Sequence, residues 1–172
     1  MGKNLTLTGM MGVGKSTIGK NLAKRLDYKF VDVDKIIEAK EGLSINSIFK
    51  SKSESYFRKI ENDITLSELK KESTVIALGG GAFLNKNIRN EILKNHFSFW
   101  LNCDSETIIK RIKNNPKRPL AYNLTNLELV NLIKKRSNTY SKASFNVNCS
   151  NLTKKQIINK IIKIYETNKI KH

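Results

Sequence analysis

A lysine, two hydroxyl side chains and three glycines lie close together near the start of the chain. The segment Gly9–Thr17 reads GMMGVGKST and fits the pattern G-x-x-x-x-G-K-[ST]. Glycines let backbone N–H groups turn toward phosphate oxygens, and the start of a following helix adds a favourable dipole. Lys15 can then reach the β- and γ-phosphates, and the Ser16 hydroxyl can bind Mg²⁺. The segment predicts a nucleoside triphosphate site rather than a glycine turn without a ligand. The expected contacts in this loop are Gly12, Val13, Gly14, Lys15, Ser16 and Thr17.

The loop does not by itself say which molecule receives the phosphate. A regulatory GTPase is expected to contain a guanine-binding N-K-x-D motif, and neither Asn-Lys dipeptide of this chain completes it. The dipeptide at Asn85 continues with Asn-Ile, and the one at Asn168 continues with Ile-Lys. At 172 residues the chain also leaves little room for a large ATPase. A small kinase fits best.

Two aspartates, Asp32 and Asp34, follow the second apolar run of the chain. At i and i+2 on a strand their side chains would point the same way, toward the sheet edge where ligands collect. One carboxylate suits the Mg²⁺ shell, and the other can accept a proton from an acceptor hydroxyl or orient that hydroxyl. The alternative is that Asp34 caps a helix.

Three further features could bind an acceptor molecule. Arg58 and Glu61 are i, i+3 neighbours on a predicted helix, so the carboxylate can hold the guanidinium, although an ordinary surface pair is the alternative. An apolar run ends in Gly79-Gly80-Gly81, which permits close approach by a ligand or simply a sharp turn. Arg118 lies in an irregular stretch, and Arg136 lies on the helix that follows it.

Short apolar runs alternate with helical patterns along almost the whole chain. Strands are predicted at Asn4–Thr8, Lys29–Val33, Thr74–Leu78, Phe97–Leu101 and Phe145–Asn148. Helices are predicted at Lys15–Leu26, Lys35–Lys40, Ile45–Phe49, Glu54–Lys71, Lys86–Lys94, Ser105–Asn114, Asn126–Ser141 and Lys154–Asn168, the last with Thr153 as its N-cap. This alternation predicts one α/β domain over residues 1–172, a three-layer sandwich with a five-stranded parallel sheet.

Taken in chain order, these features resemble the shikimate kinase family over nearly the whole chain. The resemblance implies a P-loop NTPase fold like that of nucleoside monophosphate kinases, with ATP and Mg²⁺ as cofactors. It implies phosphorylation of the 3-hydroxyl of shikimate, a step toward chorismate and the aromatic amino acids. Residues of about 114–126 would form a lid, and residues of about 34–61 a helical segment that binds the acceptor.

The resemblance also assigns roles position by position. Shikimate would be held by Asp34, Arg58, Gly80 and Arg136, with Gly79 and Gly81 on either side of the contact. Arg58 and Arg136 would clamp its carboxylate, for which a planar guanidinium fork is suited. The catalytic groups would be Lys15, Asp34 and Arg118. Arg118 would close over the ATP phosphates, Arg111 would lie against adenine, and Ser16 and Asp32 would support Mg²⁺, Asp32 through water.

Two positions depart from the family pattern. Ser53-Glu54 stands where relatives commonly have Gly-Glu before the Phe-Arg pair, so a turn glycine is missing. Asn151 stands where relatives often place a basic residue near the adenine, which leaves the adenine contacts there open. Neither departure affects the groups expected to bind phosphate or carboxylate.

The charge of the chain has two parts. The formal net charge is +17, with +4 in residues 1–106 and +13 in residues 107–172. Of the 32 basic residues 26 are Lys, whose codons are A/T-rich, so part of the charge can reflect genome composition. Four of the six Arg nevertheless occupy assigned site positions, where Lys could not reproduce the planar fork.

Two other classes of function compete with this interpretation. A related kinase acting on gluconate would share the phosphate loop but not the combination of Asp-x-Asp, three glycines and two arginines. A nucleic-acid-binding protein would account for the charge, but few aromatic residues lie among the basic ones and no known reading motif is present. We therefore expect a small-molecule substrate and no nucleic-acid partner.

The ends and the cysteines predict where the protein acts. The first residues contain no apolar segment with a cleavage site, and no segment reaches the roughly 18–20 apolar residues that span a bilayer. Cys103 and Cys149 lie far apart in sequence and form no metal-type pair. These features predict a cytoplasmic protein without a membrane partner. We expect it to be a monomer.

Overall fold

Five parallel strands form one sheet in the order β2-β3-β1-β4-β5. The computed structural model describes residues 3–113 and 124–169. The strands are β1 (Leu5–Thr8), β2 (Lys29–Asp32), β3 (Thr74–Ala77), β4 (Phe97–Asn102) and β5 (Phe145–Asn148). Each lies within one residue of its predicted bounds. The predicted α/β class and the five-stranded parallel sheet are confirmed.

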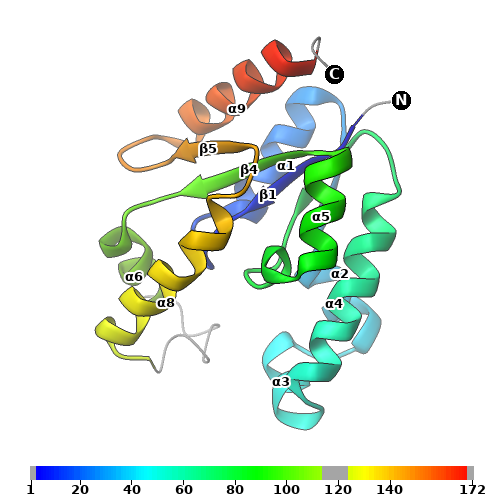
Figure 1. Cartoon of the computed structure of the whole chain (residues 1–172), viewed down its shortest axis with the longest axis vertical. Coiled ribbons are helices and arrows are strands. Elements are labelled where there is room, and N and C mark those ends of the chain that lie inside the picture. Colours follow the sequence, from blue (N-terminus) through cyan, green and yellow to red (C-terminus); the bar gives the residue numbers. More distant parts are fainter. Residues whose placement is uncertain (1–2, 114–123, 170–172) are drawn as a thin grey trace.

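Helices cover both faces of this sheet (Figure 1). The helices are α1 (Lys15–Leu26), α2 (Val33–Glu41), α3 (Ile45–Ser51), α4 (Glu54–Leu69), α5 (Lys86–Asn95), α6 (Ser105–Lys113), α8 (Asn126–Tyr140) and α9 (Lys154–Lys169). Helix α1 packs against α9, and α4 packs against α5. Along the sheet, the crossover through α1 runs from β1 toward β2, whereas those through α4 and α5 run the opposite way. Because crossovers between parallel strands are right-handed, the two pairs lie on opposite faces, which gives the predicted three layers. A short 3₁₀ helix, Ala82–Leu84, was not predicted.

The inner strands are buried on both faces because helices cover them on both sides. All four residues of β1 and of β3 are buried, and so are the first five residues of β4. Strands buried on both faces in this way are typical of parallel sheets. Helix α9 instead buries one stripe, formed by Ile157, Ile158, Ile161 and Tyr165. Thr153 caps this helix through a bond from the Gln156 N–H to Thr153 Oγ1 at 3.3 Å, as predicted.

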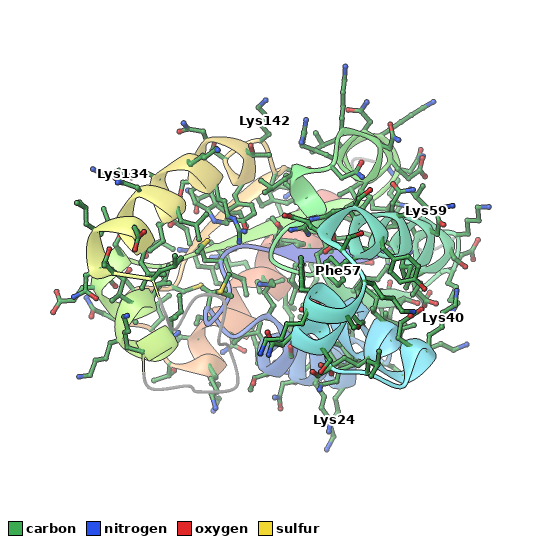
Figure 2. The ribbon with its side chains drawn as sticks, turned by 90° about the horizontal axis from the view of Figure 1, so that it is seen from below. Lys24, Lys40, Phe57, Lys59, Lys134 and Lys142 are labelled. Carbon is green, nitrogen blue, oxygen red and sulfur yellow. The ribbon has the colours of Figure 1, made fainter. Side chains whose placement is uncertain are left out.

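The surplus lysines point outward from many different helices. Figure 2 labels Lys24 on α1, Lys40 on α2, Lys59 on α4 and Lys134 on α8, and each of these side chains is exposed. Their charges are therefore spread over the surface rather than gathered on one element. Within the described ranges, no helix combines the length and the apolar character needed to cross a membrane.

Both cysteines lie just beyond neighbouring strands and are buried free thiols. Burial raises the pKa of the Cys103 thiol above its ordinary value and raises the pKa of Cys149 to about 12. Because the thiolate is the reactive form, both side chains should react slowly in the folded protein.

We expect the thiol reagent dithiobis(nitrobenzoic acid) to modify the folded protein at pH 8 at least about a hundredfold more slowly than the protein unfolded in guanidinium. The release of the coloured thiolate measures both rates. Equal rates in the two states would show that the ends of β4 and β5 are open to solvent.

Candidate active site

A cleft of about 1130 Å³ opens where the carboxyl ends of β1, β2 and β3 meet. Its floor comes from the loop between β1 and α1. One wall comes from α2, α3 and α4, and the other comes from α6 and α8. In Figure 1 the first group lies toward the lower right and the second group at the lower left. Ligands of open α/β sheets bind at this edge, so the cleft is the candidate active site.

The phosphate loop forms the floor with the geometry that the sequence predicts. Gly12 and Gly14 have φ angles of 85° and 99°, a region that favours glycine, and α1 begins immediately afterwards at Lys15. The Lys15 ammonium donates hydrogen bonds to the carbonyl oxygens of Gly9 at 2.8 Å and Met10 at 3.0 Å. Ser16 and Thr17 are exposed in the first turn of α1 and line the cleft. The N-terminus of α1 is therefore aimed at the space where a phosphate would bind.

The two aspartates reach the cleft in a different way from the one expected. Strand β2 ends at Asp32, which is the N-cap of α2 and accepts a hydrogen bond from the Lys35 N–H at 3.3 Å. Asp34 lies in the first turn of α2, so the expectation that both side chains project from one strand was wrong. The alternative that Asp34 is the helix cap was also wrong, because Asp32 caps the helix. Both residues line the cleft.

Asp34 and Glu61 meet above the backbone of Gly79. A Cβ placed on Gly79 would lie 2.6 Å from Asp34 Oδ1 and 2.6 Å from Glu61 Oε1. The close approach of these two carboxylates therefore requires glycine at this position. Burial raises the pKa of the Glu61 carboxyl above its ordinary value, and Asp34 acts in the same direction, while the Arg58 and Arg136 guanidinium groups oppose the rise.

Arg58 is held by two glutamates of its own helix. Its Nη1 lies 2.7 Å from Glu61 Oε2, as the i, i+3 spacing predicts. Its Nε and Nη2 lie 3.3 Å and 3.2 Å from Glu54 Oε1. Glu61 is only 2% exposed, whereas Arg58 is 34% exposed. The pair is thus anchored inside the protein and presents its guanidinium to the cleft, so it is not the ordinary surface pair that was the alternative.

Helix α8 is tied to the glycine turn after β3 by two side chains. Arg136 Nη1 donates to the Gly80 carbonyl oxygen at 3.4 Å, and the fully buried Tyr140 donates its hydroxyl to the same oxygen. Burial raises the pKa of the Tyr140 hydroxyl, which keeps it in the form that donates. These contacts place Arg136 beside Gly80, and the Arg58 guanidinium lies against Gly81.

An apolar surface faces these charges. The rings of Phe49 and Phe57 pack with centroids 4.7 Å apart, and the Arg58 guanidinium lies 5.2 Å from the centroid of the Phe57 ring. Figure 2 labels Phe57, which is buried and lines the cleft. The site therefore combines cationic and carboxylate groups with an apolar wall, as is typical of pockets that bind small molecules.

Other predicted residues lie farther from this group or outside the described part of the chain. Arg111 Nη1 lies 3.5 Å from the Gly12 carbonyl oxygen, beside the phosphate loop. Arg118 and most of the predicted lid, 114–123, lie outside the described residues; Thr125 and Asn126 are the N-cap and first residue of α8. Asn151 follows β5 with a φ of 59°.

Three features of the site were not anticipated from the sequence. Ser53 has an extended φ of −176°, which any residue adopts, and its hydroxyl caps α4 by accepting from the Tyr56 N–H at 3.1 Å. The missing turn glycine therefore leaves the helix start intact. The contact of Glu54 with Arg58 was missed although the i, i+4 spacing signals it, and no local pattern signals the contact of Tyr140 with Gly80.

The comparisons with known proteins agree with this geometry. The sequence profile of the shikimate kinase family matches residues 11–166. The shikimate kinase of Sulfurihydrogenibium sp. (strain YO3AOP1) is 41% identical over 160 residues, which is 93% of this chain and 96% of the relative. The chain belongs to the shikimate kinase family. The shikimate kinase of Thermodesulfovibrio yellowstonii is 39% identical, and the alignment covers 95% of each chain.

Solved structures support the same family. A shikimate kinase from Acinetobacter baumannii in complex with shikimate superposes with a TM-score of 0.92 at 28% identity, covering 98% of this chain and 96% of that one. A gluconokinase from Sinorhizobium meliloti superposes with a TM-score of 0.62 at 13% identity, a likeness that shows only a shared fold. The resemblance to shikimate kinases inferred from the sequence is confirmed.

We expect Gly79→Ala to lower the free energy of unfolding by about 1–3 kcal/mol, because the new Cβ would force the Asp34 and Glu61 carboxylates apart. Urea denaturation of the two proteins measures this difference. Gly80→Ala is the matched control, since a Cβ there lies 3.5 Å from Arg136 Nη1, an ordinary contact, and should change stability by less than about 0.5 kcal/mol. Equal stability of Gly79→Ala and the parent chain would contradict the described packing.

Proposed function

We propose that this chain transfers the γ-phosphate of ATP to the 3-hydroxyl of shikimate, giving 3-phosphoshikimate and ADP. One observation carries the proposal beyond family membership. Two guanidinium groups, Arg58 and Arg136, flank the glycine turn after β3, while Asp34 lies next to that turn and the phosphate loop forms the floor of the same cleft. Such a site fits an acceptor that has a carboxylate at one end and a hydroxyl at the other.

The nucleotide half of the proposal depends on the loop from Gly12 to Thr17. Its backbone amides and the start of α1 would bind the phosphates, and Lys15 would exchange its bonds to the Gly9 and Met10 carbonyl oxygens for bonds to the β- and γ-phosphates. We propose that Arg111, which lies beside Gly12, is near the adenine.

The residues present fit Mg²⁺. The Ser16 hydroxyl and the Asp32 carboxylate are hard oxygen donors in one cleft, and Mg²⁺ is usually bound by one or two protein oxygens together with water and substrate phosphates. Ser16 would bind the ion directly, and Asp32 would hold it through water while one of its oxygens caps α2. When bound, the ion neutralises charge on the β- and γ-phosphates.

The acceptor half places shikimate between the helical segment 34–61 and α8. Arg58 and Arg136 would bind its carboxylate, since guanidinium groups match that shape. Gly80, with Gly79 and Gly81 on either side, would allow the ring to approach the backbone. Asp34 would accept a hydrogen bond from the 3-hydroxyl and aim the oxygen at the γ-phosphorus.

The transfer itself needs positioning and charge stabilisation. The acceptor oxygen would form a bond to the γ-phosphorus as the bond to the bridging oxygen of ADP breaks, and its proton would pass to Asp34 or to water. The transition state is loose, so Lys15 and Arg118 would act by stabilising charge on the moving phosphoryl group. Residues 114–126, as a lid, would exclude water and limit ATP hydrolysis.

The setting of the enzyme is also part of this proposal. We propose that a single copy of the chain suffices for activity and acts in the cytoplasm, on a small molecule.

A panel of acceptors with coupled detection of ADP tests the function. We expect ADP release that depends on shikimate, and release with gluconate or without an acceptor at less than about 1% of that rate, because only shikimate presents a carboxylate and a reactive hydroxyl in the required positions. Removal of Mg²⁺ by EDTA should abolish the signal. Phosphorylation of gluconate but not shikimate would overturn the proposal, and tight duplex DNA binding without ADP release would favour the nucleic-acid alternative.

A further inference from the structure

The Arg58 guanidinium has two hydrogen-bonding edges in use, and they differ in character. Nη1 points inward to Glu61 at 2.7 Å. The edge formed by Nε and Nη2 is covered by a single oxygen, Glu54 Oε1, at 3.3 Å and 3.2 Å. The first contact is short and buried, and the second is long and shared between two donors.

The two glutamates differ just as strongly in their surroundings. Glu61 is 2% exposed, so water could not solvate its carboxylate if Arg58 moved away. Glu54 is 68% exposed, so water can solvate its carboxylate as soon as it leaves Arg58. Exposed ion pairs contribute little to stability, whereas a buried carboxylate that loses its partner is strongly destabilising. Glu61 is therefore the lasting partner of Arg58, and Glu54 can be displaced.

The edge that Glu54 covers is one that suits a bound carboxylate. Parallel N–H groups on Nε and Nη2 match the two oxygens of a carboxylate, which binds there as a fork. We propose that Glu54 is an internal stand-in for the substrate carboxylate: it covers the Nε–Nη2 edge of Arg58 when the site is empty and leaves when shikimate binds. This inference depends on the proposed function, because it assigns the carboxylate of the same acceptor to that edge.

Charge balance explains why the exchange is expected. Arg58 and Arg136 already share the cleft with three carboxylates, Asp34, Glu54 and Glu61. A substrate carboxylate would add a fourth, and the departure of Glu54, the exposed one, limits this accumulation of negative charge. An adjoining cavity of about 540 Å³, lined by Glu54, Arg58 and Lys135 among others, gives the displaced side chain room and a second cation nearby.

The exchange gives Glu54 a specific role in the reaction cycle. Before binding, it keeps the Arg58 guanidinium oriented by satisfying the donors that Glu61 does not reach. When shikimate binds, the contact between Glu54 and Arg58 has to break, and the free energy lost with it weakens the binding of shikimate. Glu54 is thus a positioning residue that acts through Arg58, and it should affect substrate affinity rather than the rate of phosphoryl transfer.

Calorimetric titration of shikimate into the whole protein, without nucleotide, tests this exchange. We expect Glu54→Gln to lower the Kd for shikimate about two- to fivefold, the range set by exposed ion pairs. In steady-state kinetics KM should fall by a similar factor while kcat stays the same. Glu38→Gln is the matched control: Glu38 also lines the cleft, and glutamine keeps the oxygen that accepts from the Ile45 N–H at 3.2 Å.

The outcomes separate exchange from other roles. A lower Kd in Glu54→Gln alone supports the exchange. An equal decrease in Glu38→Gln would show a general effect of negative charge at the cleft and would overturn it, and so would an unchanged or higher Kd in Glu54→Gln. If the parent chain itself fails to bind shikimate, the proposed function falls and the exchange falls with it; if the parent binds and Glu54→Gln shows no gain, only the exchange fails.

Discussion

The arrangement of the acceptor side depends on the buried carboxylate of Glu61. The Glu61 carboxylate is only 2% exposed, so it needs a charged partner inside the protein. Arg58, one helical turn earlier, is that partner, with Nη1 at 2.7 Å from Glu61 Oε2. The glycine turn after β3 then has to leave space: the Asp34 and Glu61 carboxylates approach Gly79, and the guanidinium lies against Gly81. Gly79, Gly81 and the ion pair are therefore one solution to a packing problem. Side chains larger than hydrogen at 79 or 81 would occupy the space of these charged groups.

Much of this could be read from the sequence, because the signals are local. The phosphate loop requires glycines and Lys15 at fixed spacing, and buried parallel strands appear as short apolar runs between helical patterns. The pairing of Arg58 with Glu61 follows from helical periodicity alone. The strand order, by contrast, depends on packing between distant segments, which no short pattern records.

The errors have equally physical causes. Asp32 and Asp34 were expected to share a strand, but the strand ends at Asp32 because that side chain caps the next helix. Helix α2 begins at Val33 rather than at the predicted Lys35, which places Asp34 on the helix without moving either carboxylate out of the cleft. The Gly80 carbonyl accepts from Arg136 and Tyr140, which lie 56 and 60 residues further along the chain, so only the fold could reveal these contacts.

The net charge of +17 contributes less to specificity than its size suggests. Lysines such as Lys24, Lys59 and Lys134 point outward from separate helices (Figure 2), where they can raise the local concentration of anions but fix no geometry. The chemistry needs Lys15 and a few arginines whose planar groups are held in place, above all Arg58 and Arg136.

A double-mutant cycle on the Kd for shikimate tests most directly whether Glu61 acts by holding Arg58. Arg58→Ala should raise the Kd about 10- to 100-fold, since a charge-assisted pair is lost. Glu61→Gln alone should also raise it, whereas in the Arg58→Ala background it should change the Kd less than about twofold, because coupled residues are not additive. Near-parental affinity of Arg58→Ala, or an undiminished effect of Glu61→Gln in its background, would contradict the account.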